Sequence, residues 1–340
     1  FKPEISNSIE VGLDWRMFKQ RFGLDLAFYN NITRNQILDV PMDQTTGYTK
    51  ATMNSGKVRN RGIELQLDGT PVKTKNFTWN STFTWAKNYN KVLSLAAGLT
   101  DGQTIAYTGG TNCALIAKVG GSIGDIYGYK LKRAPDGQVV WKDGITARTT
   151  EFEYVGNAYP AWKAGFSNEF SYKNFRVSIL FDGQWGGIVY SQTHHKMTEH
   201  GTLKHTLKYR ENPNFEVVGE GVMLDERGQY VPNNVPISVS KYYADYWRRA
   251  NVETNSFDAS FLKLREARIE YTIPSAGLNK IGIERLTLAL YGRNLAMWTK
   301  DFPVYDPEVA TLNNGTIVPG SEMGQLPSTR TMGFNLTLKF

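Results

Sequence analysis

The last thirteen residues, Ser328-Thr-Arg-Thr-Met-Gly-Phe-Asn-Leu-Thr-Leu-Lys-Phe340, decide how the rest of the chain is interpreted. Apolar and polar residues alternate here, which predicts a β-strand with one apolar and one polar face. In water, a bare apolar strand at a chain end invites aggregation, whereas the last strand of a transmembrane β-barrel turns that face to lipid. A soluble β-sandwich can also end this way, so the rest of the chain must separate the two. The apolar face comprises Met332, Phe334, Leu336, Leu338 and Phe340.

Similar alternation recurs along the chain. Each stretch is bounded by turn-forming residues, and each is expected to form a strand able to span the roughly 9–11 residues of a tilted membrane strand. We therefore predict an all-β protein with about nine long antiparallel strands. The eight further stretches are residues 9–17, 22–29, 63–68, 77–86, 162–173, 175–185, 266–273 and 285–293.

The connections between these stretches alternate between short and long. Short turns are expected at 18–21, 70–76, 174 and 274–280, and long loops at 39–57, 91–161, 190–257 and 299–327. An outer-membrane barrel has this pattern, with short periplasmic turns and long extracellular loops. A soluble sandwich has no reason to keep its long loops at one end.

Charged residues on the polar faces favour a wide barrel. They would crowd a narrow one, but they fit a wet lumen or a plug contact. Aromatic residues near strand ends, including Trp15, Trp79, Trp162, Tyr172 and Phe175, suit an interfacial girdle. The charged set is Glu10, Asp14, Arg16, Asp25, Glu64, Asp68, Glu169, Arg176, Asp182, Glu266, Arg268, Glu270, Arg285 and Arg293.

Composition excludes several other classes. No run of about 18 apolar residues is present, so the sequence contains no transmembrane helix. Cys113 is the only cysteine, which excludes an internal disulfide and a cysteine-based zinc site. The net charge of +7 is scattered rather than clustered, so nucleic acid is not an expected partner.

Short motifs along nearly the whole chain resemble the SusC/RagA family of TonB-dependent transporters, and they occur in the family's order. The terminal Pro-Ser-Thr-Arg of residues 327–330 and the opening Lys-Pro-Glu-Ile-Ser-Asn-Ser-Ile-Glu of residues 2–10 belong to this set. The others are Asn-Arg-Gly-Ile-Glu (60–64), Val-Gly-Asn-Ala-Tyr-Pro (155–160), Ala-Ser-Phe-Leu-Lys-Leu-Arg-Glu (259–266), Tyr-Thr-Ile-Pro (271–274), Gly-Arg-Asn-Leu (292–295) and Tyr-Asp-Pro-Glu (305–308).

The resemblance implies a large, roughly 22-stranded transmembrane β-barrel in the outer membrane of a Bacteroidetes-type Gram-negative bacterium. Residues 1–340 would form its C-terminal part, because the strand count is odd and the chain opens without Met. The upstream half of the barrel, the plug domain and the TonB box would lie outside this chain. The implied partners are TonB, a SusD-like surface lipoprotein acting as a lid, and lipid or lipopolysaccharide. A dimer of transporter–lipoprotein pairs is also implied.

The implied function is TonB-dependent active import of oligosaccharides or peptides. Two alternatives remain open at this point: a passive outer-membrane porin, and a soluble all-β binding domain. The sequence shows no supported nucleophile–base pair and no phosphate-binding loop, so we expect neither an enzyme nor a cofactor.

Aromatic residues mark the candidate substrate contacts. Tyr242, Tyr243, Tyr246 and Trp247 gather in an expected extracellular loop, and Trp141 is a further candidate. Aromatic faces beside polar groups suit sugar or peptide binding. Packing against the lid or against neighbouring loops is the alternative for these residues.

Two other clusters are interpreted as ordinary loop residues. His194, His195, His200 and His205 share one loop, but their spacing matches no metal motif. The acids Asp301, Asp306 and Glu308 lack the spacing of an EF-hand and are expected to be solvated. We therefore predict no metal site.

Overall fold

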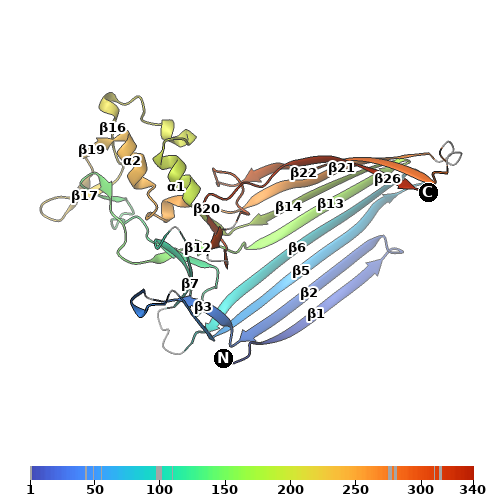
Figure 1. The fold of residues 1–340 in the computed structure, drawn as a ribbon, viewed down its shortest axis with the longest axis horizontal. Helices are drawn as coiled ribbons and strands as arrows, with labels where there is room; N and C mark the ends of the chain where they lie inside the picture. Colours follow the sequence, from blue (N-terminus) through green and yellow to red (C-terminus); the bar gives the residue numbers. More distant parts are fainter. Residues whose placement is uncertain are drawn as a thin grey trace.

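The computed structural model describes residues 2–42, 44–48, 50–54, 56–96, 102–108, 110–274, 278, 282–309, 311–313 and 316–340. Its largest element is a nine-stranded antiparallel sheet in which each strand pairs with the next long strand (Figure 1). This arrangement confirms the expected up-and-down strands. In sheet order they are β1 (Ile5–Met17), β2 (Phe22–Arg34), β5 (Lys57–Lys73), β6 (Phe77–Ser94), β13 (Trp162–Tyr172), β14 (Phe175–Trp185), β21 (Phe261–Ile273), β22 (Arg285–Thr299) and β26 (Thr331–Lys339).

Six strands extend further toward the long loops than the sequence predicts, β1, β2 and β22 among them. β5 already begins at Lys57, β6 continues to Ser94, and β21 begins at Phe261. In β5 and β6 the added length includes polar pairs such as Asn60 opposite Asn90, whose side chains hydrogen-bond at 2.9 Å. Polar residues on both faces hide a strand from a test based on apolar alternation.

One face of the sheet carries large, exposed apolar side chains. The strand register aligns them in rows, because antiparallel partners place facing side chains on the same side of the sheet. On the last strand, Met332 and Phe334 are 72% and 79% exposed, which confirms the predicted apolar face. One row crosses eight strands and contains Leu13, Leu26, Leu65, Trp85, Ala164, Gly183, Leu262 and Trp298.

The two ends of the sheet differ, as the loop lengths predict. Figure 1 shows the connection from β1 to β2 at the same end as the C-terminus, and the long loops gathered at the other end. The expected turn at 274–280 lies largely outside the described residues. The long loops were predicted only as connections between strands. In the structure they contain several small sheets and two helices, α1 (Gln192–Glu199) and α2 (Val239–Tyr246).

The long loops form one assembly because their strands pair between loops. The small sheets combine β10 (Val140–Lys142), β11 (Ile145–Thr146), β17 (Val222–Leu224) and β18 (Tyr230–Pro232), and also β15 (Ile188–Ser191), β20 (Ser256–Asp258) and β25 (Ser321–Glu322). In both sheets a parallel pair joins different loops, β10 with β17 and β15 with β25. A third sheet consists of β7 (Gln103–Thr108), β8 (Cys113–Ala117), β9 (Asp125–Gly128) and β12 (Glu153–Asn157). A shared apolar core contains Leu115, Ile126, Tyr190, Val252 and Val318.

Elsewhere, β3 (Ile37–Pro41) and β4 (Lys50–Asn54) form a hairpin in the first long loop. Smaller pairs are β16 (Glu216–Val218) with β19 (Pro236–Ser238), and β23 (Thr311–Asn313) with β24 (Thr316–Val318). Among the described residues, no helix has the length and apolar character needed to cross a membrane.

Candidate functional site

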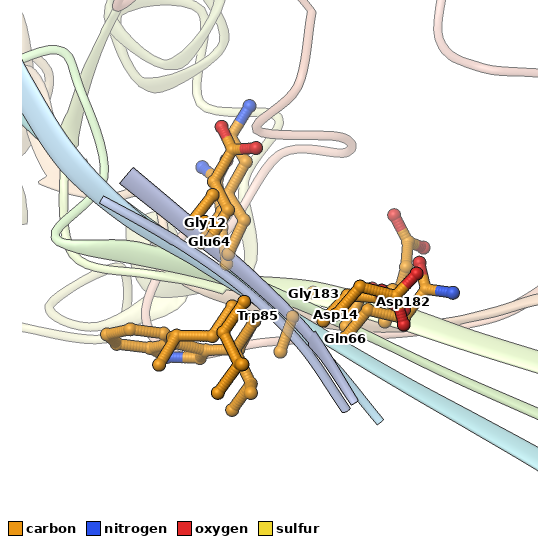
Figure 2. A pocket seen from close by; sticks show the side chains of 18 of the residues that line it. Gly12, Asp14, Glu64, Gln66, Trp85, Asp182 and Gly183 are labelled. Carbon is orange, nitrogen blue, oxygen red and sulfur yellow. The ribbon is translucent and has the colours of Figure 1, made fainter. Parts of the chain in front are cut away.

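The polar face of the large sheet lines the first candidate site. A cavity of about 780 Å³ lies along β1, β2, β5, β6, β13 and β14. Its polar lining includes Asp14, Glu64, Gln66 and Asp182, and Figure 2 shows the Glu64 carboxylate on the opposite side of the strands from Trp85. This two-sided arrangement follows from the period of two along each strand. The cavity surface therefore offers hydrogen-bonding groups and charges beside apolar surface.

Arg16 forms ion pairs with two acidic side chains at one edge of this cavity. The register places Asp14 directly opposite Asp25, which by itself would bring two like charges together. The Arg16 guanidinium lies between them, with its nitrogens 3.2 Å from an Asp14 oxygen and 2.9 Å from an Asp25 oxygen. All three side chains are exposed in part, so the ion pairs order the wall more than they stabilise it.

A denser ion network joins the wall to the last long loop. The Lys263 amine on β21 donates to the Asp306 carboxylate at 2.7 Å and to Glu308. Both Lys263 and Asp306 have side chains only 3% exposed. On the same strand, Arg265 donates to Asp182 at 2.6 and 2.7 Å and to Glu308 at 3.0 Å. Two cations on the wall thus hold two acids of the loop.

A β-bulge makes this network possible. Leu180 of β14 pairs with Glu266, but the next residue, Phe181, pairs with Leu264, so Arg265 is an extra residue in β21. The bulge changes the phase of the alternation, which places the neighbours Arg265 and Glu266 on the same polar face. The sequence carries a trace of this change, because the apolar alternation of β21 is in one phase before Arg265 and in the other after Glu266.

The loop acids were expected to be solvated, and for Asp306 this expectation is wrong. Burial on its own raises the pKa of the Asp306 carboxyl, but hydrogen bonds from Lys263 and Ser328 outweigh it and hold that pKa below its usual range. The Ser328 hydroxyl donates at 2.5 Å. Nearby, Tyr305 donates to Glu322, a fully buried carboxylate that also accepts from Ser191 at 2.5 Å. The segment 302–308 is therefore fixed to both the wall and the loop assembly.

The structure brings the five predicted aromatic residues into one cluster. Helix α2 presents three of them and begins at an N-cap where Ser238 Oγ accepts from the Lys241 amide. The Trp141 indole is 1% exposed and stacks on Tyr242 and Tyr246, with ring centroids 6.1 Å apart in each pair. Sequence alone gave no reason to join Trp141 to α2, because the contact arises from packing between two different loops.

Three of the five residues line a pocket of about 300 Å³. The role of all five as substrate contacts remains a prediction, but Trp141 and Tyr246 lie outside this pocket. The Tyr243 hydroxyl is engaged in the fold, donating to the carbonyls of His205 at 2.9 Å and Lys208 at 2.8 Å. The lining consists of His194, His205, Lys208, Tyr209, Tyr242, Tyr243, Trp247, Phe257, Asp301 and Pro303.

Three of the four histidines, all but the exposed His200, serve mainly in packing. Expected in an ordinary polar loop, His194 and His195 are instead buried in α1. The His194 ring donates to Asn255 at 2.9 Å and the His195 ring donates to the Trp247 carbonyl at 2.8 Å. Burial lowers the pKa of His194 to about 4, so its ring is neutral at pH 7. Among the described residues, no group of three or more His, Cys, Asp or Glu side chains is arranged to hold a metal ion.

Comparisons with known proteins agree with this fold. The family model described as "TonB dependent receptor-like, beta-barrel" matches residues 1–295. The chain is 29% identical over 367 residues to TonB-dependent receptor P26 of Formosa agariphila, which covers 99% of this chain and 34% of that protein. It is 24% identical over 202 residues to TonB-dependent receptor SusC of Bacteroides thetaiotaomicron, and the match covers 56% of this chain and 20% of that protein.

Solved structures give the same result for the fold. The RagAB peptide importer in the "closed-closed" state superposes with a TM-score of 0.70 and 21% identity, covering 99% of this chain and 35% of that chain. The present chain spans about a third of the length of the curated relatives P26, P3 and P39. Its nine strands are therefore part of a large barrel wall, as predicted.

Proposed function

Because this chain belongs to the TonB-dependent receptor-like β-barrel family, we propose that it forms the C-terminal part of an outer-membrane nutrient importer. The plug domain, the TonB box and the upstream barrel strands are supplied by the rest of the protein. The proposed activity is TonB-dependent uptake of oligosaccharides or peptides in a Bacteroidetes-type bacterium.

The two-faced sheet is the observation that carries this proposal. Its apolar face exposes rows of large side chains to the surroundings, and its polar face lines a wide, charged cavity. A lipid environment accommodates the first face and a wet lumen accommodates the second. The same geometry argues against the soluble binding domain, since in water the rows of large apolar side chains on the outer face would remain exposed.

The ordered loop assembly supports import rather than passive flow. In the proposed orientation the interlocked loops lie on the extracellular side, and the segment 302–308 is tied by Lys263 and Arg265 to the wall. A rigid outer surface of this kind is suited to docking a SusD-like lipoprotein lid, which the names of the relatives SusC and RagAB make a reasonable partner. A dimer of transporter–lipoprotein pairs is proposed on the same basis.

Substrate contact is assigned to the exposed aromatic surface of the loop pocket. Tyr242 and Trp247 are only partly buried there, and the neighbouring Lys208 and Asp301 offer a donor and an acceptor. Rings beside hydrogen-bonding groups bind the apolar faces of sugars and peptide side chains. The buried Trp141 and Tyr243 act in this proposal by positioning these contacts.

Uptake by cells that express the full-length protein tests the proposal. Cells are given labelled oligosaccharides or peptides, with and without an uncoupler that removes the proton-motive force. We expect uptake to require the gene and to stop with the uncoupler. Gene-dependent uptake that persists with the uncoupler would instead establish a passive channel. Recovery of the full-length protein without detergent would overturn the membrane assignment itself.

A matched pair of variants tests the substrate contact. Trp247→Ala removes a pocket ring, whereas Trp298→Ala removes a half-exposed ring from the outer face. We expect only the first variant to raise the half-saturating substrate concentration. Equal uptake by both would remove the case for the loop pocket. Purification of a lipoprotein with the wild-type protein tests the lid independently.

A further inference from the structure

The apolar face of the sheet is interrupted by a groove near its long-loop end. In the row that crosses eight strands, the fifth and sixth positions are the small residues Ala164 and Gly183, which face each other on β13 and β14. Their neighbours in the row are the large residues Trp85 and Leu262. Two small residues between large ones lower the surface locally, and a cavity of about 480 Å³ lies there.

Aromatic rings wall this groove on two sides. Toward the loops, Trp162 and Trp185 stack with centroids 6.3 Å apart and planes within 10° of each other. Toward the short-turn end, the facing pair Phe166 and Phe181 closes the other side. Trp298, which is 53% exposed, extends the wall laterally. Strand register places Trp162 opposite Trp185 and Phe166 opposite Phe181, so the groove is built from paired strand positions.

A cation lies at the loop-side rim. The Lys300 amine is 5.1 Å from the centroid of the Trp185 ring and donates to the Asp258 carboxylate at 2.6 Å. The Lys300 side chain is half exposed, so its remaining N–H groups are open to a second acceptor. Among the described residues that line the groove, Lys300 is the one with a positive charge. The lining also includes Asp182, but its carboxylate lies on the polar face of the sheet and pairs with Arg265.

We propose that this groove binds one acyl chain of a membrane lipid whose phosphate headgroup contacts Lys300. The inference rests on the proposed membrane location. It follows from three features that ordinary lipid-facing surface does not combine: a recessed floor, parallel ring walls and a cation at the membrane–water boundary. Water in such a groove would find few hydrogen-bonding partners, whereas an acyl chain would bury apolar surface on three sides. The walls are continuous with the apolar face, so the chain can enter from the bilayer.

A filling variant tests the groove. In the full-length protein, Ala164→Leu raises the floor while keeping the face apolar. Leu288→Phe is the matched control, because it enlarges an exposed apolar side chain outside the groove. The probe is phosphatidylglycerol, and the readout is lipid retained per protein by native mass spectrometry after detergent exchange. We expect Ala164→Leu to lower retention about tenfold, since leucine displaces about two methylene groups of the chain.

The headgroup contact has its own test. Lys300→Gln should lower the retention of phosphatidylglycerol about threefold, the size of one exposed ion contact, and leave the retention of diacylglycerol, which has no phosphate, unchanged. Equal loss of both lipids would overturn the assignment of the headgroup to Lys300. Equal retention by wild type, Ala164→Leu and Leu288→Phe would mean non-specific boundary lipid only, and would overturn the groove.

Two further measurements keep these outcomes interpretable. A thermal melt of each variant in detergent confirms that it is folded before retention is compared. Substrate uptake is measured in parallel, and we expect it to be unchanged in Ala164→Leu because this side chain is in the row of Trp85, on the opposite side of the sheet from the Glu64 carboxylate. If the wild-type protein shows no substrate uptake, the proposed function is contradicted, but the comparison of lipid retention still stands. Recovery of the protein without detergent would defeat both.

Discussion

The sheet and the loop assembly bury their side chains in opposite ways. The loop assembly has ordinary apolar clusters, in which Trp141, Tyr190 and Val252 are almost fully enclosed. In the sheet, the largest apolar residues are outside and the charges face the cavity. The comparison teaches that the sheet depends on its surroundings for stability, whereas the loop assembly carries a core of its own. The two meet at Lys263, Arg265, Asp306 and Glu308.

The largest effect is expected at this junction. Lys263→Ala leaves the buried Asp306 carboxylate without its cation, which costs about 3–5 kcal/mol for a buried pair. Hydrogen exchange should show loss of protection over residues 302–308 while the core of the loop assembly stays protected. The control is Arg293→Ala, whose exposed pair with Glu266 should contribute less than about 1 kcal/mol. Equal protection in both variants would show that the network does not anchor the segment.

The next effect contrasts the two faces of one strand. Leu336→Arg places a charge on the outer face of β26, where lipid-exposed arginine costs about 2–4 kcal/mol near the bilayer centre. Asn335→Arg places the same charge on the polar face, one residue away, and should cost little. Urea unfolding in lipid vesicles measures the difference. Equal destabilisation would contradict the assignment of the faces.

Acidification should weaken the loop assembly before the sheet. The pKa of His194 is about 4 in the folded protein and about 6.5 when it is unfolded, so the unfolded state takes up a proton first as the pH falls. The stability contributed by the neutral ring is complete above about pH 6.5 and is lost progressively toward pH 4, reaching roughly 2 kcal/mol of loss at pH 5. Thermal melts between pH 7 and 5 should detect it, and His194→Asn should flatten the slope. The exposed His200→Asn variant should not.

The smallest effect separates a positioning role from simple packing. Tyr243→Phe keeps the ring but removes the hydroxyl that donates to two carbonyls, which should cost about 1–2 kcal/mol. The more exposed Tyr230→Phe is the control and should be neutral. Because Tyr243 lines the loop pocket, we also expect the half-saturating substrate concentration to rise while the maximal rate of uptake is retained. A change in rate alone would contradict the positioning role.

Much of the sheet could be predicted from sequence because its signal is local. In a strand with one apolar and one polar face, apolar and polar residues alternate along the sequence. Residues such as Leu336 and Asn335 can therefore be assigned to a face without any knowledge of the neighbouring strands. The prediction failed where both faces are polar, as at Asn60 and Asn90, and at Arg265, where the bulge changes the phase. The structure at these positions depends on the pairing between neighbouring strands, and the residue pattern of a single strand carries no information about that pairing.

The candidate site was predicted less completely. Composition identified the aromatic residues of α2, but not their contact with Trp141, and it interpreted Asp306 as a solvated acid. Both outcomes depend on segments far apart in the chain. Lys263 and Asp306 are distant in sequence, and neither residue's neighbours indicate that the other will enclose it.

By itself, the sequence determined the number of strands, their order, the apolar and polar faces and the end at which the long loops lie. The physical reason is that alternation and connection length are properties of consecutive residues. Only the tertiary structure decided that the loops interlock through β10 with β17 and β15 with β25, that Asp306 is buried, and that Ala164 and Gly183 form the floor of a groove. These features arise from register and packing between distant strands, and that information appears only when the strands are placed side by side.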